Sequence, residues 1–325
     1  MEKLYFENDN DAIIALRNKY EILKNEVGKV IVGQDEVVKD VILSIFCRSH
    51  ALLVGVPGLA KTLMITTIAK ALGLSFNRIQ FTPDLMPSDI MGTEILDETR
   101  NFKFIKGPVF ANIVLADEIN RTPPKTQSAL LEAMQERSVS MAGTTYQLPN
   151  PFFVLATQNP IEQEGTYPLP EAQLDRFMFN ILLDYPSVAE EIDIVKNTVT
   201  QNLPEPEVVM SMEEVVFYQE FMKKIPIVDN VYQYAVNLSV MTRPNTPKAH
   251  QWANEYLAWG AGPRASQNFI VAARAHAVIN GKYSPDIEDV KAVAPNILRH
   301  RLVRNYKAEA EGISMEDIIQ EFINA

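Results

Sequence analysis

Residues 55–62 read Gly-Val-Pro-Gly-Leu-Ala-Lys-Thr, and this octapeptide is the most informative part of the chain. It stands between an apolar run, residues 51–54, and a helical stretch that begins near Leu63. A strand that ends in such a loop points consecutive backbone amides at one place, and the following helix adds the positive end of its dipole. The pattern therefore predicts a phosphate-binding loop and a nucleoside triphosphatase.

The loop also predicts individual contacts to the nucleotide. Lys61 is expected to reach the β and γ phosphates, and Thr62 to bind magnesium. Ala60 departs from the usual pattern, in which a glycine precedes the lysine. A surface turn would explain the glycines but not Lys-Thr at the start of a helix. The residues expected to contact the nucleotide are Gly55, Pro57, Gly58, Leu59, Ala60, Lys61, Thr62 and Leu63.

Five short apolar runs, separated by helix-length segments, predict a parallel α/β sheet. Continuous Val, Ile, Leu and Phe runs are typical of strands buried on both faces. The expected strands are residues 52–55, 76–81, 113–117, 152–157 and 179–183. After residue 186 the strand-like runs disappear and helix-like segments follow. We therefore expect N-terminal helices and an α/β nucleotide-binding core over residues 1–186, and an all-α domain over residues 187–325.

Two segments of the core have the pattern of hairpin insertions, near residues 84–106 and 138–149. Residues 93–105 alternate around a polar turn, and residues 139–148 alternate around Ala142-Gly143. Alternation predicts one buried face for each ribbon. Nucleotide-driven machines often contact a partner through such protrusions, and an ordinary surface ribbon is the alternative.

Polar residues follow two of the expected strands, at the edge where phosphates bind in open α/β folds. Asp117 is expected to hold magnesium through water, and Glu118 to polarise the attacking water as general base. Asn159 follows the next strand, where an amide orients this water and senses the γ phosphate. The implied reaction is hydrolysis of the γ phosphate.

Several arginines are candidates for further roles. Arg176 precedes the last strand, at a surface where a neighbouring subunit would receive it, and an arginine delivered in trans stabilises transition-state charge. Arg264 lies in the first turn of a helix, an unfavourable place for a cation without a phosphate partner. Arg121 is either a second trans-acting group or an ordinary ion-pair partner. Residues 299–301, Arg-His-Arg, together with Arg304, are interpreted as a solvated helix end or a subunit contact, with a DNA-binding patch as the alternative.

Composition narrows the class of partner. The chain has 325 residues, of which 47% are hydrophobic, enough for a large core and two domains. A net charge of −11 argues against binding along a phosphate backbone, so a protein partner is expected and no nucleic acid. No apolar run approaches a membrane span and the start is acidic, which predicts a cytoplasmic protein without membrane insertion. The four histidines lack ligand spacing, so no zinc site is expected.

Taken together, seven stretches of the chain resemble the MoxR-type AAA+ ATPase family, and the similarity extends from Ile31 to about Arg304. These stretches are residues 55–62, 78–89, 107–121, 124–134, 156–160, 169–177 and 263–266. The resemblance implies an AAA+ P-loop core with a five-stranded parallel sheet, followed by a helical lid. An alanine before the loop lysine is common in this family, so Ala60 agrees with it.

The resemblance also implies a role for each candidate residue: Lys61 and Thr62 form Walker A, Asp117 and Glu118 Walker B, Asn159 sensor 1, Arg176 the arginine finger and Arg264 sensor 2. The two hairpins match the helix-2 and pre-sensor-1 insertions. ATP and Mg²⁺ are the implied cofactors. Because the lid is repositioned in this clade, Arg264 is expected to serve either its own nucleotide or a neighbour's.

Family members usually form hexameric rings with nucleotide between subunits, which agrees with an arginine acting in trans. They resemble chaperones that assemble or activate partner complexes, often with a separate protein bearing a von Willebrand factor A domain. We therefore expect a homo-hexamer that hydrolyses ATP and remodels a protein client. One alternative is the ATPase subunit of a metal chelatase. The other is a nucleic-acid motor, and the hairpin tips near residues 97–101 and 142–145 disfavour this second alternative because the tips are not basic. A scaffold without turnover is disfavoured because every catalytic position carries a competent residue.

Overall fold

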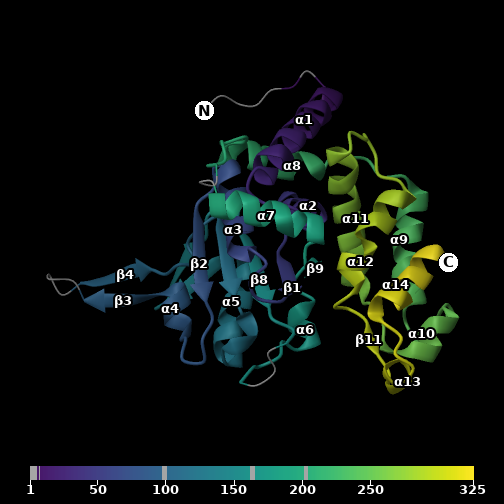
Figure 1. The fold of residues 1–325 in the computed structure, drawn as a ribbon. Coiled ribbons are helices and arrows are strands. Elements are labelled where there is room, and N and C mark those ends of the chain that lie inside the picture. The colour runs from purple at the N-terminus through teal and green to yellow at the C-terminus, as the bar shows by residue number, and fades with distance from the viewer. Residues whose placement is uncertain (1–5, 7, 97–100, 162–164, 201–203) are drawn as a thin grey trace. The chain divides into compact units, whose positions relative to one another are not determined.

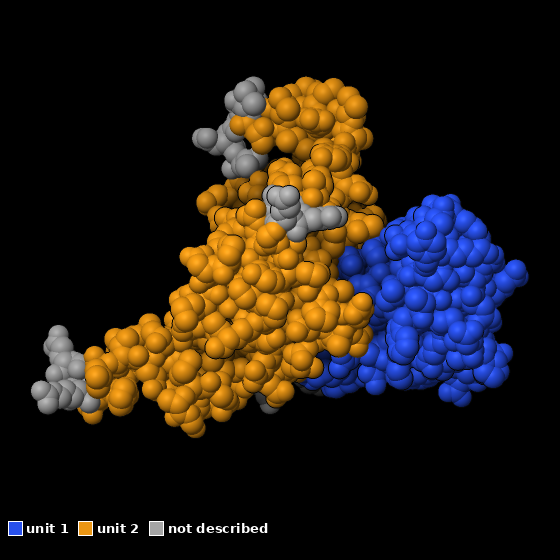
Figure 2. Space-filling view, turned by 90° about the horizontal axis from the view of Figure 1, so that it is seen from below, with its two compact units in different colours: residues 1–20, 177–180, 217–325 blue, residues 21–176, 181–216 orange. Residues whose placement is uncertain are grey.

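The computed structural model describes residues 6, 8–96, 101–161, 165–200 and 204–325. The chain forms two compact units, shown in separate colours in Figure 2. The first, which we call the sheet unit, consists of residues 21–176 and 181–216. The second, the helical unit, consists of residues 1–20, 177–180 and 217–325.

A five-stranded parallel sheet forms the centre of the nucleotide-binding fold, as the sequence predicts. Its strand order is β2-β5-β8-β1-β9. The strands are β1 (Ala51–Gly55), β2 (Phe76–Gln80), β5 (Ile113–Asp117), β8 (Phe153–Gln158) and β9 (Phe179–Leu183). All of β5 and β8 is buried except the last residue of each strand, which is half-buried. Both strands therefore leave the core at the same edge of the sheet, where Asp117 and Gln158 end them.

The helices around this sheet begin and end as the sequence patterns indicate. The phosphate loop leads from β1 directly into α3 (Lys61–Ala71), and α5 (Pro124–Glu136) begins with a proline, whose missing N–H is not needed there. The other helices that lie wholly or partly in this unit are α1 (Asp9–Gly28), α2 (Asp35–Phe46), α4 (Pro87–Met91), the 3₁₀ helix Ile119–Arg121, α6 (Glu171–Leu174), α7 (Val188–Thr200) and the start of α8 (Met212–Met222). In the described part of the chain, no helix is both long and apolar enough to cross a bilayer.

A glycine is required where β1 meets β9. A Cβ atom on Gly55 would lie 2.7 Å from the carbonyl oxygen of Leu183, closer than real Cβ contacts come. Gly55 therefore lets the last sheet strand pass close to the start of the phosphate loop.

Both predicted hairpins are present (Figure 1). β3 (Gly92–Leu96) pairs antiparallel with β4 (Phe102–Lys106), and β6 (Ser138–Met141) pairs with β7 (Thr144–Gln147). The expected polar tip of the first hairpin, residues 97–100, lies outside the described residues.

The prediction of one buried face is wrong for the first hairpin. Ile95, Leu96, Phe102 and Ile105 are between 42% and 73% exposed, because this ribbon extends away from the sheet instead of packing on it (Figure 1). The second hairpin does bury one side, since Val139 is buried and its partner Tyr146 is half-buried. The Tyr146 ring stacks on Phe104 of the first hairpin, with 4.2 Å between the ring centroids.

The helical unit has the expected helices and a small two-stranded ribbon that was not predicted. Its helices are the first part of α1 (residues 9–20), α8 (Met212–Met222, shared with the sheet unit), α9 (Asp229–Met241), α10 (Gln251–Tyr256), α11 (Pro263–Ile279), α12 (Ile287–Leu298), α13 (Tyr306–Ala310) and α14 (Met315–Asn324). The ribbon pairs β10 (Leu257–Trp259) with β11 (Val303–Arg304). Asp286 and Ser314 cap α12 and α14 by accepting the backbone N–H three residues on.

The compact units divide the chain differently from the boundary expected after residue 186. Residues 187–216 cluster with the sheet unit. One reason is that the backbone N–H of Val209 donates to the carbonyl of Ala71 at 2.7 Å, and that of Glu207 donates to the carboxylate of Glu26 at 3.2 Å. These bonds tie the segment after α7 to the helices beside the sheet.

Candidate functional site

The phosphate loop carries two residues with left-handed backbone, Gly58 at φ +87° and Ala60 at φ +55°. Only glycine adopts this conformation without cost, which explains why the usual pattern has glycine before the lysine. At Ala60 the cost is about 1 kcal/mol. Ala60 nevertheless adopts the left-handed conformation that the glycine of the usual pattern takes.

Lys61 connects the loop to the acid pair. Its Nζ donates a hydrogen bond to the carbonyl of Gly55. Burial lowers the pKa of Lys61, and the carboxylates of Asp117 and Glu118 oppose that effect. The ammonium therefore lies within electrostatic reach of both acids.

Asp117 is held in place by two neighbours. The hydroxyl of Thr157 donates to its Oδ1 at 2.6 Å, and Arg78 donates to its Oδ2 through Nη2 at 2.5 Å and Nε at 3.1 Å. The Asp117 side chain is 14% exposed, so the ion pair of Asp117 with Arg78 lies at the edge of the core. The carboxylate is fixed at the end of β5.

Glu118 follows in a left-handed conformation, with φ +57°. Its backbone N–H donates to the hydroxyl of Thr157 at 2.9 Å. Its Oε2 accepts from Gln80 at 2.8 Å and from Arg121 at 3.1 Å. Arg121 was expected to be either a trans-acting group or an ion-pair partner, and in this chain it forms an ion pair with Glu118.

Asn159 lies one residue beyond β8, the strand between β1 and β5. It is 7% exposed, and its Oδ1 accepts the backbone N–H of Ile161 at 3.1 Å. The structure thus brings the ends of three adjacent strands together: the phosphate loop, the acid pair and Asn159 all follow strand ends at one edge of the sheet.

A cavity of about 130 Å³ adjoins the phosphate loop. The segment between α1 and α2 forms one side of it, and α7 another. It is lined by Val30, Ile31, Val32, Gln34, Gly58, Leu59, Ala60, Leu63, Pro186, Ile194, Asn197 and Thr198. An apolar lining with a few polar groups suits a flat aromatic ring that has a polar rim. The segment that joins the two N-terminal helices therefore covers this side of the site.

Two further predicted site residues, Arg176 and Arg264, lie on other segments of the chain. Arg176 is half-buried, and its described hydrogen bond goes from Nη1 to the carbonyl of Leu131 on α5, at 2.8 Å. Arg264 is exposed in the first turn of α11 and belongs to the helical unit. Arg176 has no described hydrogen bond to Lys61 or to the acid pair.

Sequence reasoning missed Arg78, Gln80 and Thr157, which hold the acid pair. Arg78 and Gln80 alternate on β2, and the register places Gln80 opposite Asp117. The available signal was the pair of polar residues two positions apart in a strand next to the acid-bearing strand. It identifies them only once the neighbouring strand and the register are known.

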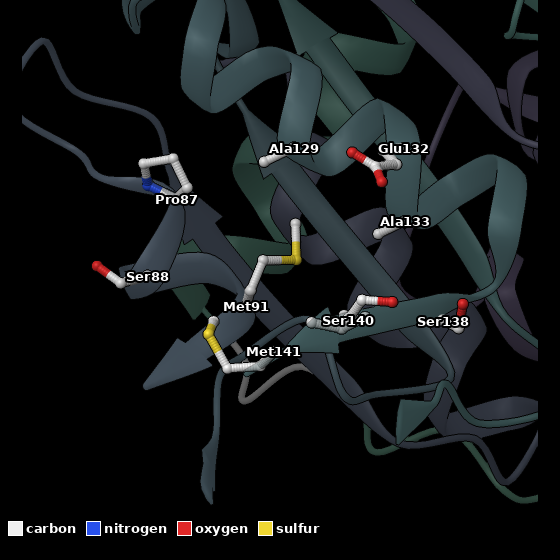
Figure 3. A pocket seen from close by; sticks show the side chains of 10 residues that line it. Pro87, Ser88, Met91, Ala129, Glu132, Ala133, Ser138, Ser140 and Met141 are labelled. Carbon is white, nitrogen blue, oxygen red and sulfur yellow. The ribbon is translucent and has the colours of Figure 1, made fainter. Parts of the chain in front are cut away.

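A larger cavity, of about 230 Å³, lies along β6, the first strand of the second hairpin (Figure 3). α4, α5 and β6 line it, with Pro87, Ser88, Met91, Ala129, Glu132, Ala133, Ser138, Val139, Ser140 and Met141. Methionine side chains adapt to differently shaped partners and are common on surfaces that bind proteins. This cavity shares no lining residue with the one beside the phosphate loop.

Known families and structures agree with this geometry. The chain matches the ATPase family associated with various cellular activities (AAA) over residues 50–179, and the AAA lid domain over residues 249–322. It is 46% identical to Chaperone MoxR1 of Mycobacterium tuberculosis over 300 residues, which is 92% of this chain and 79% of that protein. It is 42% identical over 301 residues to the uncharacterized protein YeaC of Bacillus subtilis, covering 92% and 91% of the two chains.

A solved structure shows the same fold. The crystal structure of a protein provisionally assigned as an ATPase, from Cytophaga hutchinsonii, superposes with a TM-score of 0.90. The two are 45% identical, and the match covers 97% of this chain and 96% of that one.

Proposed function

This chain belongs to the MoxR-type AAA+ ATPase family and is an ATP hydrolase, and from that premise we propose that it works as a homo-hexameric ring. In this proposal ATP is hydrolysed between subunits, and the ring remodels, assembles or activates partner proteins. The observation that carries it is that Arg176 has no hydrogen bond to the acid pair of its own subunit in the described structure. Arg176 contacts α5, whereas Arg78 and Arg121 are paired with Asp117 and Glu118. A neighbour's Arg176 would supply the cation that the transition state needs.

Each residue of the site has a step in the proposed reaction. Lys61 and the loop amides bind the phosphates, and Asn159 orients a water molecule in line with the γ phosphorus. The water oxygen attacks that phosphorus, the bond to the bridging oxygen breaks, and ADP leaves. Glu118 takes the proton of the water, for which its carboxylate exchanges the hydrogen bonds to Gln80 and Arg121.

A magnesium ion fits the oxygen groups at this edge. Thr62 offers a hydroxyl and Asp117 a carboxylate, which are the ligand types that Mg²⁺ prefers. An ion held there would offset the negative charge of the phosphates. The cavity between the loop and α7 is the proposed site of the adenine base.

The partner is proposed to be a protein, such as a separate protein with a von Willebrand factor A domain. The first hairpin exposes Ile95, Leu96, Phe102 and Ile105, and the Met91 and Met141 side chains line a cavity along the first strand of the second. Exposed apolar groups on a protruding ribbon favour protein contacts. A net charge of −11 disfavours nucleic acid. The relative from Mycobacterium tuberculosis is itself described as a chaperone.

Mixing two inactive variants tests the shared site. Glu118→Gln removes the base from a subunit's own site, and Arg176→Ala removes the cation that it gives to its neighbour. If the site is shared, an equal mixture regains activity at about a quarter of the interfaces, those with an intact half from each subunit. If both groups act within one subunit, the mixture stays as inactive as its components.

A further inference from the structure

The segment Arg299–Arg301 is buried, contrary to its interpretation as a solvated helix end or subunit contact. It follows the last residue of α12. His300 and Arg301 are each 7% exposed, and the Arg299 side chain is 13% exposed. Burying a guanidinium costs several kcal/mol unless its donors are satisfied. The contacts that satisfy these side chains therefore indicate what the segment does.

All three side chains donate to backbone carbonyls of residues 177–180. Arg301 donates through Nη2 to Phe177 at 2.8 Å and through Nη1 to Met178 at 3.1 Å. His300 donates through Nε2 to the same Phe177 carbonyl at 3.0 Å. Arg299 donates through Nη1 to the carbonyl of Asn180. Three consecutive side chains thus hold three of the four carbonyls in one short segment.

The protonation of His300 agrees with this arrangement. Burial lowers its pKa well below the usual value, and the charge of Arg301 acts in the same direction. In the described structure the buried Nδ1 has no hydrogen-bond partner. The ring is therefore neutral with its proton on Nε2, where it donates to Phe177.

The held segment begins at the residue that follows Arg176. The chain passes into the helical unit between Arg176 and Phe177 and leaves it after Asn180. Phe177 is fully buried, so the backbone beside Arg176 is fixed on its C-terminal side. The fork of Arg301 matches two successive carbonyls, a geometry that the single ammonium of a lysine does not reproduce.

We propose that Arg301, with Arg299 and His300 beside it, is a positioning group for Arg176. The inference rests on the proposed function, in which Arg176 reaches the nucleotide of a neighbouring subunit. A group that acts in a transition state loses activity steeply when it is displaced by about 1 Å. Arg301 sets the path of the backbone from which the Arg176 side chain extends, and through it the helical unit of one subunit affects hydrolysis in the next.

The first test is Arg301→Lys, which keeps the charge and loses the fork. We expect kcat for ATP hydrolysis to fall by about tenfold or more, with ADP affinity and ring mass little changed, at an assay temperature where the melting curve shows the variant to be folded. Arg304→Lys is the matched control, because Arg304 also donates to a backbone carbonyl in the helical unit, that of Ile313 at 2.8 Å. This control is expected to keep the parent kcat. If Arg301→Lys keeps it as well, the proposal is wrong.

The second test asks which subunit needs Arg301. In the mixture of Glu118→Gln and Arg176→Ala subunits, the former donates only Arg176 and the latter only the hydrolytic site. Arg301→Lys on the subunit that donates Arg176 is expected to abolish most of the regained activity, whereas on the subunit with the hydrolytic site it has little effect. Equal effects on both subunits, or an effect only on the latter, would overturn the proposal. If the parent mixture regains no activity, it is the shared site itself that fails.

Discussion

At the scale of single residues, two non-glycine residues of the candidate site hold left-handed backbone, Ala60 and Glu118. Such residues cost free energy and persist where the surroundings determine their conformation. At Glu118 the surroundings are visible, since Thr157 accepts its N–H while Gln80 and Arg121 hold its carboxylate. The site therefore depends on residues outside the nucleotide-binding motifs.

The conformation of Ala60 leads to a prediction about stability. Ala60→Gly removes a Cβ atom from a left-handed position and is expected to raise the free energy of unfolding by up to about 1 kcal/mol. Ala71→Gly, at the end of α3, is the control and is expected to lower it by about 1 kcal/mol. Urea unfolding measures both. A loss of similar size in the two variants would show that the left-handed conformation at position 60 carries no cost.

Thr157 leads to a prediction about activity. Thr157→Val keeps the shape of the side chain but removes its bonds to Asp117 and to the Glu118 N–H. We expect kcat to fall by about tenfold or more, because both acids lose a fixed neighbour. Thr157→Ser retains the hydroxyl and should keep most of the activity. If the valine variant has the same kcat as the serine variant, the hydroxyl does not position the acid pair.

At the scale of elements, the buried ring of His50 joins strand β8 to helix α5. Its Nδ1 accepts the N–H of Val154 on β8 at 3.0 Å, and its Nε2 donates to the carbonyl of Met134 on α5 at 3.2 Å. Burial lowers the pKa of His50 to about 4 from an ordinary 6.5. The ring is therefore neutral in the folded protein over most of the pH range.

This shift makes stability depend on pH. Because the folded pKa is below the unfolded one, the contribution of His50 is complete above pH 6.5 and is lost as the pH falls towards 4. The loss is about 3 kcal/mol. Urea unfolding at pH 7 and pH 4.5 is expected to show a larger decrease for the parent than for His50→Gln, which does not titrate. His300 contributes in the same direction in both proteins. Equal decreases would contradict the role given to His50.

The base of the first hairpin depends on a close approach between two backbone segments. A Cβ atom on Gly107 would lie 2.3 Å from the carbonyl oxygen of Ile90. Gly107→Ala is therefore expected to separate β4 from the end of α4 and to speed amide exchange over residues 92–96 and 102–106. Gly143→Ala, whose Cβ would meet open space in the second hairpin, should leave exchange in these strands unchanged. Unchanged exchange in the Gly107 variant would show that the close approach is dispensable.

The sequence predicts those features of the site that arise from residues close together in the chain, and it does not predict those that arise from contacts between distant residues. The phosphate loop and the acid pair follow from short continuous patterns, so their place at the sheet edge was predictable. Arg78 and Gln80 depend on the register between β2 and β5, and no pattern within one strand encodes a register. Arg301 was misinterpreted because its partners, Phe177 and Met178, are more than one hundred residues away in the chain.

At the scale of the whole molecule, the fold was predictable and its division into units was not. The five strands and the helices after them follow from hydrophobic patterns and are confirmed. Residues 177–180 cluster with the helical unit and residues 187–216 with the sheet unit, where hydrogen bonds join segments distant in the sequence: side chain to backbone at Phe177, and backbone to backbone at Val209. The chain passes from the sheet unit into the helical unit directly after Arg176, the residue proposed to act on the nucleotide of a neighbouring subunit.

The central claim is that hydrolysis requires assembly and a trans-acting Arg176. It is tested most directly by the ATPase rate per subunit over a protein dilution series, with the particle mass measured in parallel, for the parent and for Arg176→Ala. The account predicts that the parent's rate per subunit rises as the ring forms, and that the variant binds nucleotide and assembles but does not hydrolyse. A dilute monomer that hydrolyses ATP equally well with and without Arg176 would contradict it.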